Sequence, residues 1–290
     1  MKKLTALGLS LVLAVSMLAG CGGNSQSATG SNSKNVTAKV IEIELTQEEY
    51  AFGVDKAQPE LLAQVNEFIA EIKSNGTFDE ICNKYFGDGT PTPVTSAALD
   101  PSKDQLVIAT NAAFEPFEYM QGENYYGIDM EIAAALAAKL GKELVISNME
   151  FDAVCLSIGQ HKCDIAMSGL TIKEDRKEYV DFTDSYYSAS QNLIVPSTDD
   201  KFASCTDAAS VEAILKTFDS NTKIGVQNGT TGQFYCEGDP DWGFEGFAVT
   251  TVGYKNGSLA VQDLLNGNIQ YVVIDSAPAA CITEALNKMQ

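Results

Sequence analysis

Side chains that could do chemistry follow the ends of several predicted strands. Arg176 lies in "GLTIKEDR", after the strand expected at 163–168, and could hold a carboxylate through two parallel hydrogen bonds. Asp275 follows "IQYVVI" and could accept hydrogen bonds from an ammonium group. The turn "QNGTTG", which contains Thr230 and Thr231, precedes a predicted helix and could offer backbone N–H groups to an anion. Together these groups suit the two charged ends of a free amino acid.

Each of these residues taken alone has a simpler interpretation. Arg176 could be a solvated charge in "KEDRKEY", Asp275 could be a plain helix N-cap, and Phe114 could belong to the core. Thr230 and Thr231 could merely cap a helix. Ligands of α/β sheets bind at the carboxyl ends of the strands, so the shared position of these residues favours a ligand site.

The composition argues against several classes of function. The chain has 290 residues, and its 39 Asp and Glu outweigh 19 Lys and Arg, which gives a formal net charge of −20. Phosphate backbones repel such a chain, so we expect no nucleic-acid partner. With no Ser/His/Asp array and no phosphate-binding loop, we expect no catalytic residues and no cofactor. The single histidine, His161, argues against a His-rich metal site.

Six cysteines follow residue 21, and none of them forms a CxxC pair, so we expect no metal. The sequence does not choose among their possible disulfide pairings. Three of them lie beside apolar helix positions and are expected to be small buried hydrophobic residues. The six are Cys82, Cys155, Cys163, Cys205, Cys236 and Cys281, and those three are Cys82, Cys155 and Cys281.

Strand-like and helix-like segments alternate along the chain, which predicts an α/β fold with largely parallel sheets and helices on their faces. Asp129 is the expected N-cap of one helix, and 197–221 is mostly polar and weakly patterned. The predicted strands are 39–45, 49–54, 105–110, 143–147, 163–168, 191–196, 222–226, 246–252 and 269–275. The predicted helices are 59–73, 78–86, 128–141, 151–159, 258–266, and two that start near Thr230 and at Ser276.

The first 21 residues are typical of an export signal. Lys2 and Lys3 precede an apolar run, and "LAGC", which ends at Cys21, resembles the bacterial lipobox, in which the cysteine is lipidated, for example by palmitate. A plain secretory peptide or an uncleaved anchor are the alternatives. Residues 22–35 are rich in Gly, Ser and Asn and are expected to be a flexible tether. We therefore expect a membrane-anchored protein outside the cytoplasm.

Longer motifs carry a resemblance to a known family. The segments "LVIATNAAFEPFEYMQGENYYGIDMEIAAALA", "DIAMSGLTIKEDRKEYVDFTDSYY", "IGVQNGTTGQFY" and "NGNIQYVVIDSAP" resemble the family 3 extracellular solute-binding proteins, which are the polar amino-acid-binding components of ABC importers. The resemblance covers nearly all of 36–290. It implies a two-lobed, periplasmic-binding-protein-like fold of type II, a membrane permease as partner, no enzyme activity and a monomer.

The order of the segments departs from the family. Family members end with pieces similar to "IEIELTQEEYAFGV", 59–73 and "NGTFDEICNKYFG", but here these pieces come first. The chain therefore resembles a circular permutant, in which 88–104 joins the usual termini. The expected lobes are 48–192 for the first and 36–47 plus 195–290 for the second, with the crossings near 45–49 and 191–196 and both new termini on the second lobe. A truncated duplication is the alternative.

The resemblance also implies a role for each site residue. Arg176 would pair with the ligand carboxylate, helped by backbone N–H groups near Thr171 and in the turn of Thr230 and Thr231. Asp275 would pair with the ammonium group. The ammonium group would also contact a carbonyl or hydroxyl of Ser168 or Gly169, and Thr171.

The rest of the implied site surrounds the ligand side chain. Phe114 and Phe151 would sandwich that side chain, and Asn111 and Gln227 would line its far end. Binders of cationic amino acids often carry Asp where Asn111 stands, so we favour a polar uncharged ligand. Glu118, in "PFEY", is expected to be solvated, although it would reverse this preference if it pointed into the cleft.

Two other functions stay open on the sequence alone. Some relatives with this fold are exported dehydratases, but that chemistry needs a cleft acid or base with a tuned pKa. The residues at the strand ends include no spare His or Lys. A sensory input domain is the other alternative, although no kinase segment follows in this chain.

Overall fold

The computed structural model describes residues 36–290. The predicted signal segment at 1–21, the tether at 22–35 and the lipidated Cys21 lie outside the described residues. Within 36–290, none of the helices combines the length and apolar character that a membrane span requires.

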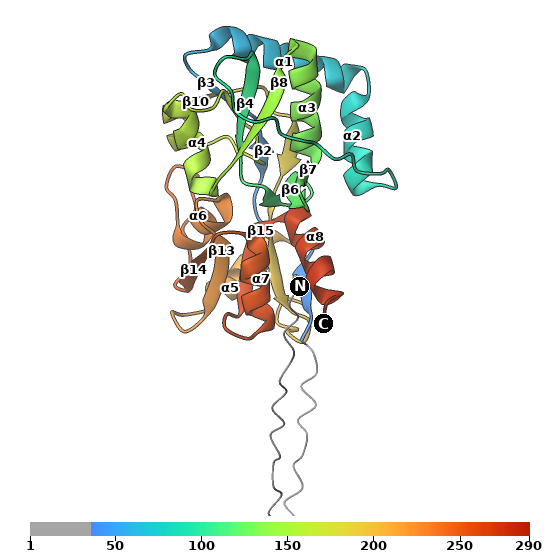
Figure 1. Cartoon of the computed structure of the whole chain (residues 1–290). Coiled ribbons are helices and arrows are strands. Elements are labelled where there is room, and N and C mark those ends of the chain that lie inside the picture. The colour runs from blue at the N-terminus through green and yellow to red at the C-terminus, as the bar shows by residue number, and fades with distance from the viewer. Residues whose placement is uncertain (1–35) are drawn as a thin grey trace, which may run out of the picture. The chain divides into compact units, whose positions relative to one another are not determined.

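The first lobe is built on a five-stranded sheet with the order β10 (Val180–Phe182), β3 (Gly53–Asp55), β9 (Ile165–Ala166), β4 (Gln105–Thr110) and β8 (Glu143–Asn148). Side chains alternate across β4. Leu106 and Ile108 pack in one apolar cluster with α3 (Ile128–Leu140), whereas Ala109 packs in another with α4 (Phe151–Gly159). The two helices therefore cover opposite faces of this sheet (Figure 1).

The helix α1 (Pro59–Ser74) completes this lobe together with α2 (Thr77–Phe86). Pro59 stands at the first helical position, where its missing N–H leaves no hydrogen bond unmade. One face of α1 is apolar at helical spacing, and that face is buried in the core. Its buried residues are Leu61, Val65, Phe68, Ile69 and Ile72.

The second lobe has its own five-stranded sheet, with the order β1 (Ala38–Ile41), β12 (Gln191–Pro196), β15 (Tyr271–Asp275), β13 (Lys223–Gln227) and β14 (Thr250–Tyr254). Helices α7 (Gly257–Leu265) and α8 (Ser276–Asn287) share an apolar cluster with Val272 and Ile274. Helices α5 (Ala208–Leu215) and α6 (Thr231–Glu237) share another with Val273. This sheet is also covered on both faces.

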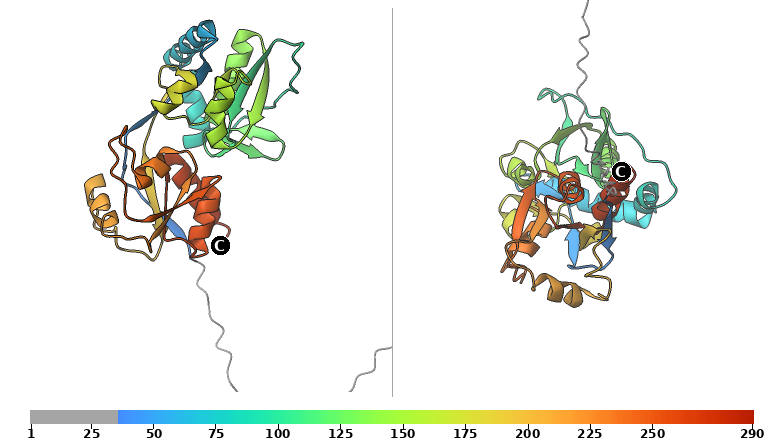
Figure 2. Two further views of the ribbon diagram at one scale, coloured as in Figure 1. Left: turned by 90° about the vertical axis from the view of Figure 1, so that its left-hand side faces the viewer. Right: turned by 90° about the horizontal axis from the view of Figure 1, so that it is seen from below.

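Two antiparallel strands, β2 (Glu48–Tyr50) and β11 (Tyr187–Ala189), form a separate ladder. They run between the two lobes, as the left view of Figure 2 shows. A small sheet of β5 (Ala113–Phe114), β6 (Glu118–Gln121) and β7 (Asn124–Tyr126), and a 3-10 turn at Asp175–Glu178, complete the structure.

The prediction of largely parallel sheets was wrong, because both large sheets are mixed. In the first lobe β3 is antiparallel to its neighbours, and in the second β12 is antiparallel to β1 and β15. Both strands enter their sheet directly from the β2–β11 pair. They do not follow the helical crossover that joins parallel strands. The crossing expected at 191–196 accordingly lies earlier, at β11, because β12 belongs wholly to the second sheet.

One helix was not predicted, and one local expectation was wrong. The weakly patterned stretch 197–221 contains α5. Its N-cap residue, Asp207, and its third helical residue, Ser210, exchange hydrogen bonds in a capping box. Asp129 is not the N-cap of α3, because that position is Gly127 and the Asp129 side chain is buried inside the lobe.

Residues 88–104 lie against the first lobe. The backbone groups of Val94 and Tyr125 exchange two hydrogen bonds of 2.8 and 2.9 Å, and Ala97 N–H donates to the carbonyl of Leu144 at 2.8 Å. At the other end of the chain, the Asn287 side chain makes two hydrogen bonds to the backbone of Ala38, at 2.8 and 2.9 Å. The last helix thus ends beside the first strand (Figure 1).

We predict that Gly127→Ala lowers the free energy of unfolding by about 3 kcal/mol or more, because φ is +123° and a Cβ there would lie 2.0 Å from the carbonyl oxygen of Phe117. Gly122→Ala is the control: φ is +65° and nothing lies within 4 Å, so it should lose only about 1 kcal/mol. Urea denaturation of both variants measures the difference. Equal losses would contradict the clash.

Candidate ligand site between the lobes

Nine of the predicted site residues line one small pocket. Its free volume of about 10 Å³ is room for about one water molecule. The first lobe supplies its part from segments that follow β4, β8 and β9, and the second lobe from the ends of β13 and β15. The lining residues are Phe114, Phe151, Gly169, Thr171, Arg176, Gln227, Thr230, Thr231 and Asp275.

Arg176 is buried at the junction of the lobes, with 8% of its surface exposed. Its guanidinium donates to the carbonyl of Thr171 at 2.6 Å and, across the junction, to the carbonyl of Gly229 at 3.0 Å. It also lies over the ring of Phe151, 5.3 Å from the ring centre. The interpretation as a solvated charge is therefore wrong. The guanidinium fork can accept an anion in place of the two neutral carbonyls.

Asp275 ends β15 and is buried, and the hydroxyl of Tyr50 on β2 donates to its carboxylate at 2.5 Å. It does stand at the N-cap of α8, but its side chain makes no capping hydrogen bond. Burial, and then the negative charge of Glu48, raise the pKa of Asp275 to about 7. A positive group brought next to this carboxyl would stabilise its charged form.

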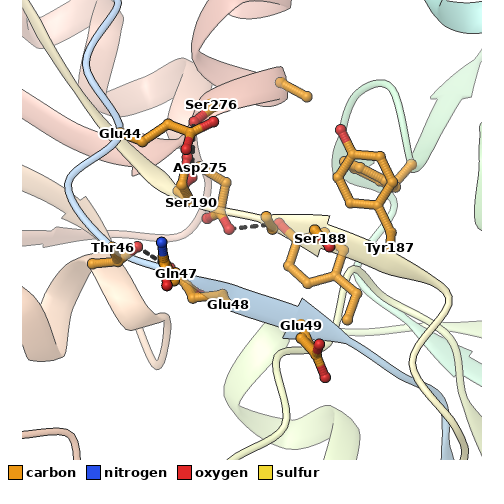
Figure 3. A pocket seen from close by; sticks show the side chains of 14 residues that line it. Glu44, Thr46, Gln47, Glu48, Glu49, Tyr187, Ser188, Ser190, Asp275 and Ser276 are labelled. Atoms are coloured by element: carbon orange, nitrogen blue, oxygen red, sulfur yellow. Dashed lines mark hydrogen bonds between the residues drawn. The ribbon is translucent and has the colours of Figure 1, made fainter.

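Glu48 is a buried carboxylate at the hinge that accepts three hydrogen bonds. Thr46 on its own segment donates at 2.6 Å, Gln191 of β12 at 3.0 Å and Thr171 of the first lobe at 2.9 Å. Glu48 also lines a larger pocket of about 530 Å³ that shares Asp275 with the first pocket (Figure 3). The carboxylate thus ties the crossing strand to both lobes.

The two amide residues predicted for the side-chain end meet across the junction. Gln227 donates from its side-chain nitrogen to Oδ1 of Asn111 at 3.0 Å. Asn111 is held in turn by the carbonyl of Met149 at 2.6 Å. Oε1 of Gln227 is buried and has no partner among the described residues. An unpaired buried acceptor is costly, so this end of the pocket favours a hydrogen-bond donor.

Ser168 stands behind the pocket instead of lining it. Its hydroxyl accepts from the backbone N–H of Asn111 at 3.0 Å and donates to Glu118 at 2.9 Å. Glu118 has 1% exposure, so the expectation that it is solvated was wrong. Burial, and then the charge of Asp129, raise its pKa well above the usual value.

Asp129 anchors the glycine that closes the pocket. Its carboxylate accepts from the backbone N–H of Gly169 at 2.9 Å and from the hydroxyl of Tyr186 at 2.7 Å. Burial raises its pKa to about 7. Gly169 has φ of +47°, and a Cβ there would lie 2.9 Å from the ring of Phe114. Phe114 belongs to the main apolar cluster and also lines the pocket.

The first turn of α6 also faces the pocket. Thr230 stands at the N-cap, but its hydroxyl donates to the carbonyl of Gln227 at 2.8 Å and makes no capping bond. Thr231 is the first helical residue. The interpretation as simple side-chain caps is therefore wrong.

The described residues offer no alternative centre for metal or disulfide chemistry. All six cysteines of this part of the chain are free thiols; Cys155 is buried, while Cys82 and Cys281 are only partly so. Within 36–290 no cluster of three or more His, Cys, Asp or Glu side chains has a metal-binding arrangement.

Comparison with known proteins identifies the family. Residues 14–88 and 106–278 match the pattern of the "Bacterial extracellular solute-binding proteins, family 3". The chain belongs to this family of solute-binding proteins. The resemblance drawn from the motifs is therefore confirmed, as is the α/β, two-lobed fold of type II.

Individual relatives of this solute-binding protein align over only part of their length. It is 33% identical to the arginine-binding extracellular protein ArtP of Bacillus subtilis over 152 residues, which cover 52% of this chain and 55% of ArtP. It is 30% identical to the probable histidine-binding protein of Neisseria gonorrhoeae over 196 residues, or 66% of each chain. The chain thus spans between about half and two thirds of these curated relatives.

A solved structure shares the fold. An ancestral arginine-binding protein bound to glutamine has a TM-score of 0.52 and 29% identity, over 63% of this chain and 74% of that one.

Sequence reasoning missed the buried acids and the tyrosine behind the pocket of this solute-binding protein. The sequence places Glu48 only in the crossing near 45–49 and Tyr50 only in a predicted strand, and it assigns Asp129 to a helix cap and Glu118 to solvent. One signal was present: the alternation in "EEY" buries Glu48 and Tyr50 and exposes Glu49. No sequence signal indicated that Glu118 and Asp129 would meet behind Ser168.

We predict that the free energy of unfolding falls as pH rises from 5 to 7.5. Asp129 and Asp275 have a pKa of about 7 in the folded protein, against the usual 3.8. In this window the folded state binds more protons than the unfolded state, so stability falls as pH rises, on the order of 1 to 3 kcal/mol for each carboxyl.

Urea denaturation across this pH range measures the loss. Asp129→Asn should remove part of it, whereas Asn at the exposed Asp181 is the control and should leave it unchanged. Stability that stays constant or rises over the window would show that these carboxyls are ionised in the folded state.

Proposed function

We propose that this protein binds a zwitterionic amino acid between its two lobes and delivers it to an ABC importer. One observation carries the proposal: Arg176 and Asp275 are both buried in one pocket, and neither has an oppositely charged side chain within 4.0 Å among residues 36–290. A buried charge without a partner is unfavourable. One ligand with an anionic and a cationic end would neutralise both.

Closure of the lobes is the proposed mechanism. Side chains already meet across the junction: Arg176 reaches Gly229, Gln227 reaches Asn111, and Lys173 pairs with Asp239 at 3.0 Å. The pocket is too small for an amino acid, so the lobes must separate to admit one. A ligand that contacts both lobes stabilises the closed form by its differential affinity. A permease that recognises this closed form completes the proposed transport cycle.

The proposed location, membrane anchor and oligomeric state rest on the relatives and on the first 21 residues. We propose an extracytoplasmic protein held at the cell membrane by a lipid on Cys21 and acting as a monomer. The binding residues carry no general acid or base that a ligand would not already occupy, which supports a binding protein over an enzyme.

We propose a polar uncharged side chain for the ligand. The amides of Asn111 and Gln227 form that end of the site, and Oε1 of Gln227 lacks a donor among the described residues. An amide or hydroxyl donor would satisfy it. The glutamine in the ancestral arginine-binding protein is of this kind.

A cationic side chain is the second candidate, because two relatives are named for arginine and histidine. One atom also favours it: Oε2 of the buried Glu118 has no hydrogen-bond partner in the described part of the chain. Calorimetric titration with L-glutamine, L-arginine and L-histidine decides between the candidates. Tighter binding of glutamine supports the first, and tighter binding of arginine or histidine supports the second.

We predict that Arg176→Ala weakens binding of the preferred amino acid by about 2–5 kcal/mol, which is roughly 30- to 5000-fold, because the ligand carboxylate loses its buried partner. The neighbouring Lys177→Ala is the control, since Lys177 is exposed and pairs with Glu174 outside the pocket. Calorimetry measures both. A loss under fivefold for Arg176→Ala would remove this residue from the site.

We further propose that the chain is a circular permutant, with 48–192 as the first lobe and 36–47 plus 195–290 as the second. The family matches in two separate segments, and the alignments with two relatives cover only 52% and 66% of this chain. The contact of Asn287 with Ala38 supports it too, because it puts the two ends that the usual order would join side by side.

A reordered chain tests the permutation. The reordered chain consists of 105–290, a short Gly/Ser linker and 36–87. We predict that it folds and binds the same amino acid with a dissociation constant within about threefold, because the linker replaces the contact of Ala38 with Asn287 and only the joint at 88–104 is lost. Circular dichroism and calorimetry measure the outcome, with 36–290 as the control. Failure of the reordered chain to fold would favour the truncated duplication.

A further inference from the structure

Two buried carboxyls, Glu48 and Asp275, lie together at the hinge, and the proposed ligand would meet only one of them. Both line the larger pocket, but Asp275 alone also lines the small one (Figure 3). The three donors on Glu48 come from Thr46, Gln191 and Thr171, and a charged carboxylate accepts from all three. These three hydrogen bonds therefore hold the Glu48 carboxylate in place beside Asp275.

Asp275 has much less support for a charge of its own. Tyr50 donates one hydrogen bond to it, and it has no cationic partner within 4.0 Å in the part of the chain that the structure describes. Two neighbouring buried carboxyls are not readily charged together. The titratable or charged groups that face Asp275 are Glu48 and Tyr50 of β2, Tyr187 of β11, Glu118 of β6, and Arg176 from the same pocket. The carboxyls of Glu48 and Glu118 disfavour a second negative charge, whereas Arg176 and the hydrogen bond from Tyr50 favour it.

We propose that Glu48 is a positioning residue for the ammonium end of the site: its charge keeps a proton on Asp275 until the ammonium group of the ligand replaces that proton. This rests on the proposed function. In the exchange, the protonated carboxyl of Asp275 and the ligand ammonium give a carboxylate–ammonium pair, and one proton leaves to the buffer. Binding is then linked to proton release, and protons compete with the amino acid.

The linkage has a definite sign. The free protein holds the extra proton below about pH 7, and the ligand removes it, so affinity falls as pH falls. The dissociation constant should rise about fivefold from pH 7 to 6 and about tenfold from pH 6 to 5. Close to one proton should leave for each ligand bound at pH 6, and almost none at pH 8.5.

Calorimetry in two buffers of different ionisation enthalpy counts these protons, with L-glutamine and L-arginine as the probes. Glu48→Gln keeps the size of the side chain and an acceptor oxygen but removes the charge. It should bind with less than half of the proton release at pH 6 and move the pH profile to lower pH. Glu49→Gln is the matched control, because Glu49 is the next residue on β2 and is exposed. It should behave as the unchanged protein.

The outcomes separate the two proposals. Binding of either probe with less than about 0.2 proton released at pH 6 overturns the exchange, even if Glu48→Gln does not fold. Unchanged proton release in a folded Glu48→Gln variant, or loss of release in Glu118→Gln alone, overturns the role of Glu48. A protein that binds neither probe, nor any other free amino acid, overturns the proposed function itself.

Discussion

The burial of an arginine that has no carboxylate of residues 36–290 beside it is the constraint on which the rest of the site depends. Arg176 is held by two carbonyl oxygens, one from each lobe, and by the ring of Phe151. Carbonyl dipoles orient a guanidinium but do not neutralise it, so the pocket keeps a positive end. That end needs rigid support. The segment around Thr171 supplies this support, because the Thr171 hydroxyl also donates a hydrogen bond to Glu48 at the hinge.

The opposite end of the pocket belongs to the hinge. Tyr50 lies on β2, one of the two strands that run between the lobes, and it bonds directly to Asp275 of the second lobe. Its backbone also pairs with Thr171 of the first lobe. A rotation of the lobes about the β2–β11 pair would therefore disturb the contacts of Asp275 less than those of Arg176 with Gly229. The negative end is set by the hinge, and the positive end is completed by closure.

The sequence predicted the pocket better than the sheets that carry it. Asp275 ends a buried strand, and Arg176 and the turn of Thr230 come after one. The carboxyl ends of strands converge whatever the exact sheet order. Strand direction was harder, because nothing in the residues of β3 or β12 distinguishes a strand that arrives by a helical crossover from one that arrives through the hinge. Direction depends on the path of the chain and not on local pattern.

The buried acids were beyond reach for a different reason. Glu118 and Asp129 lie in segments whose polar residues are typical of a protein surface. Only the packing of β6 against α3 and the loop of Gly169 buries their side chains. Their burial is tolerable because each accepts hydrogen bonds from groups that the fold has to place there anyway: the hydroxyl of Ser168 for Glu118, and the amide of Gly169 for Asp129. Asp129 in turn fixes Gly169 at its positive φ, so that the backbone rather than a side chain meets Phe114 at the pocket wall. The acids behind the pocket thus explain why its wall can be built from backbone so close to an aromatic ring. A ligand in this pocket would contact a wall of backbone, so binding would cost no side-chain conformational entropy at that point.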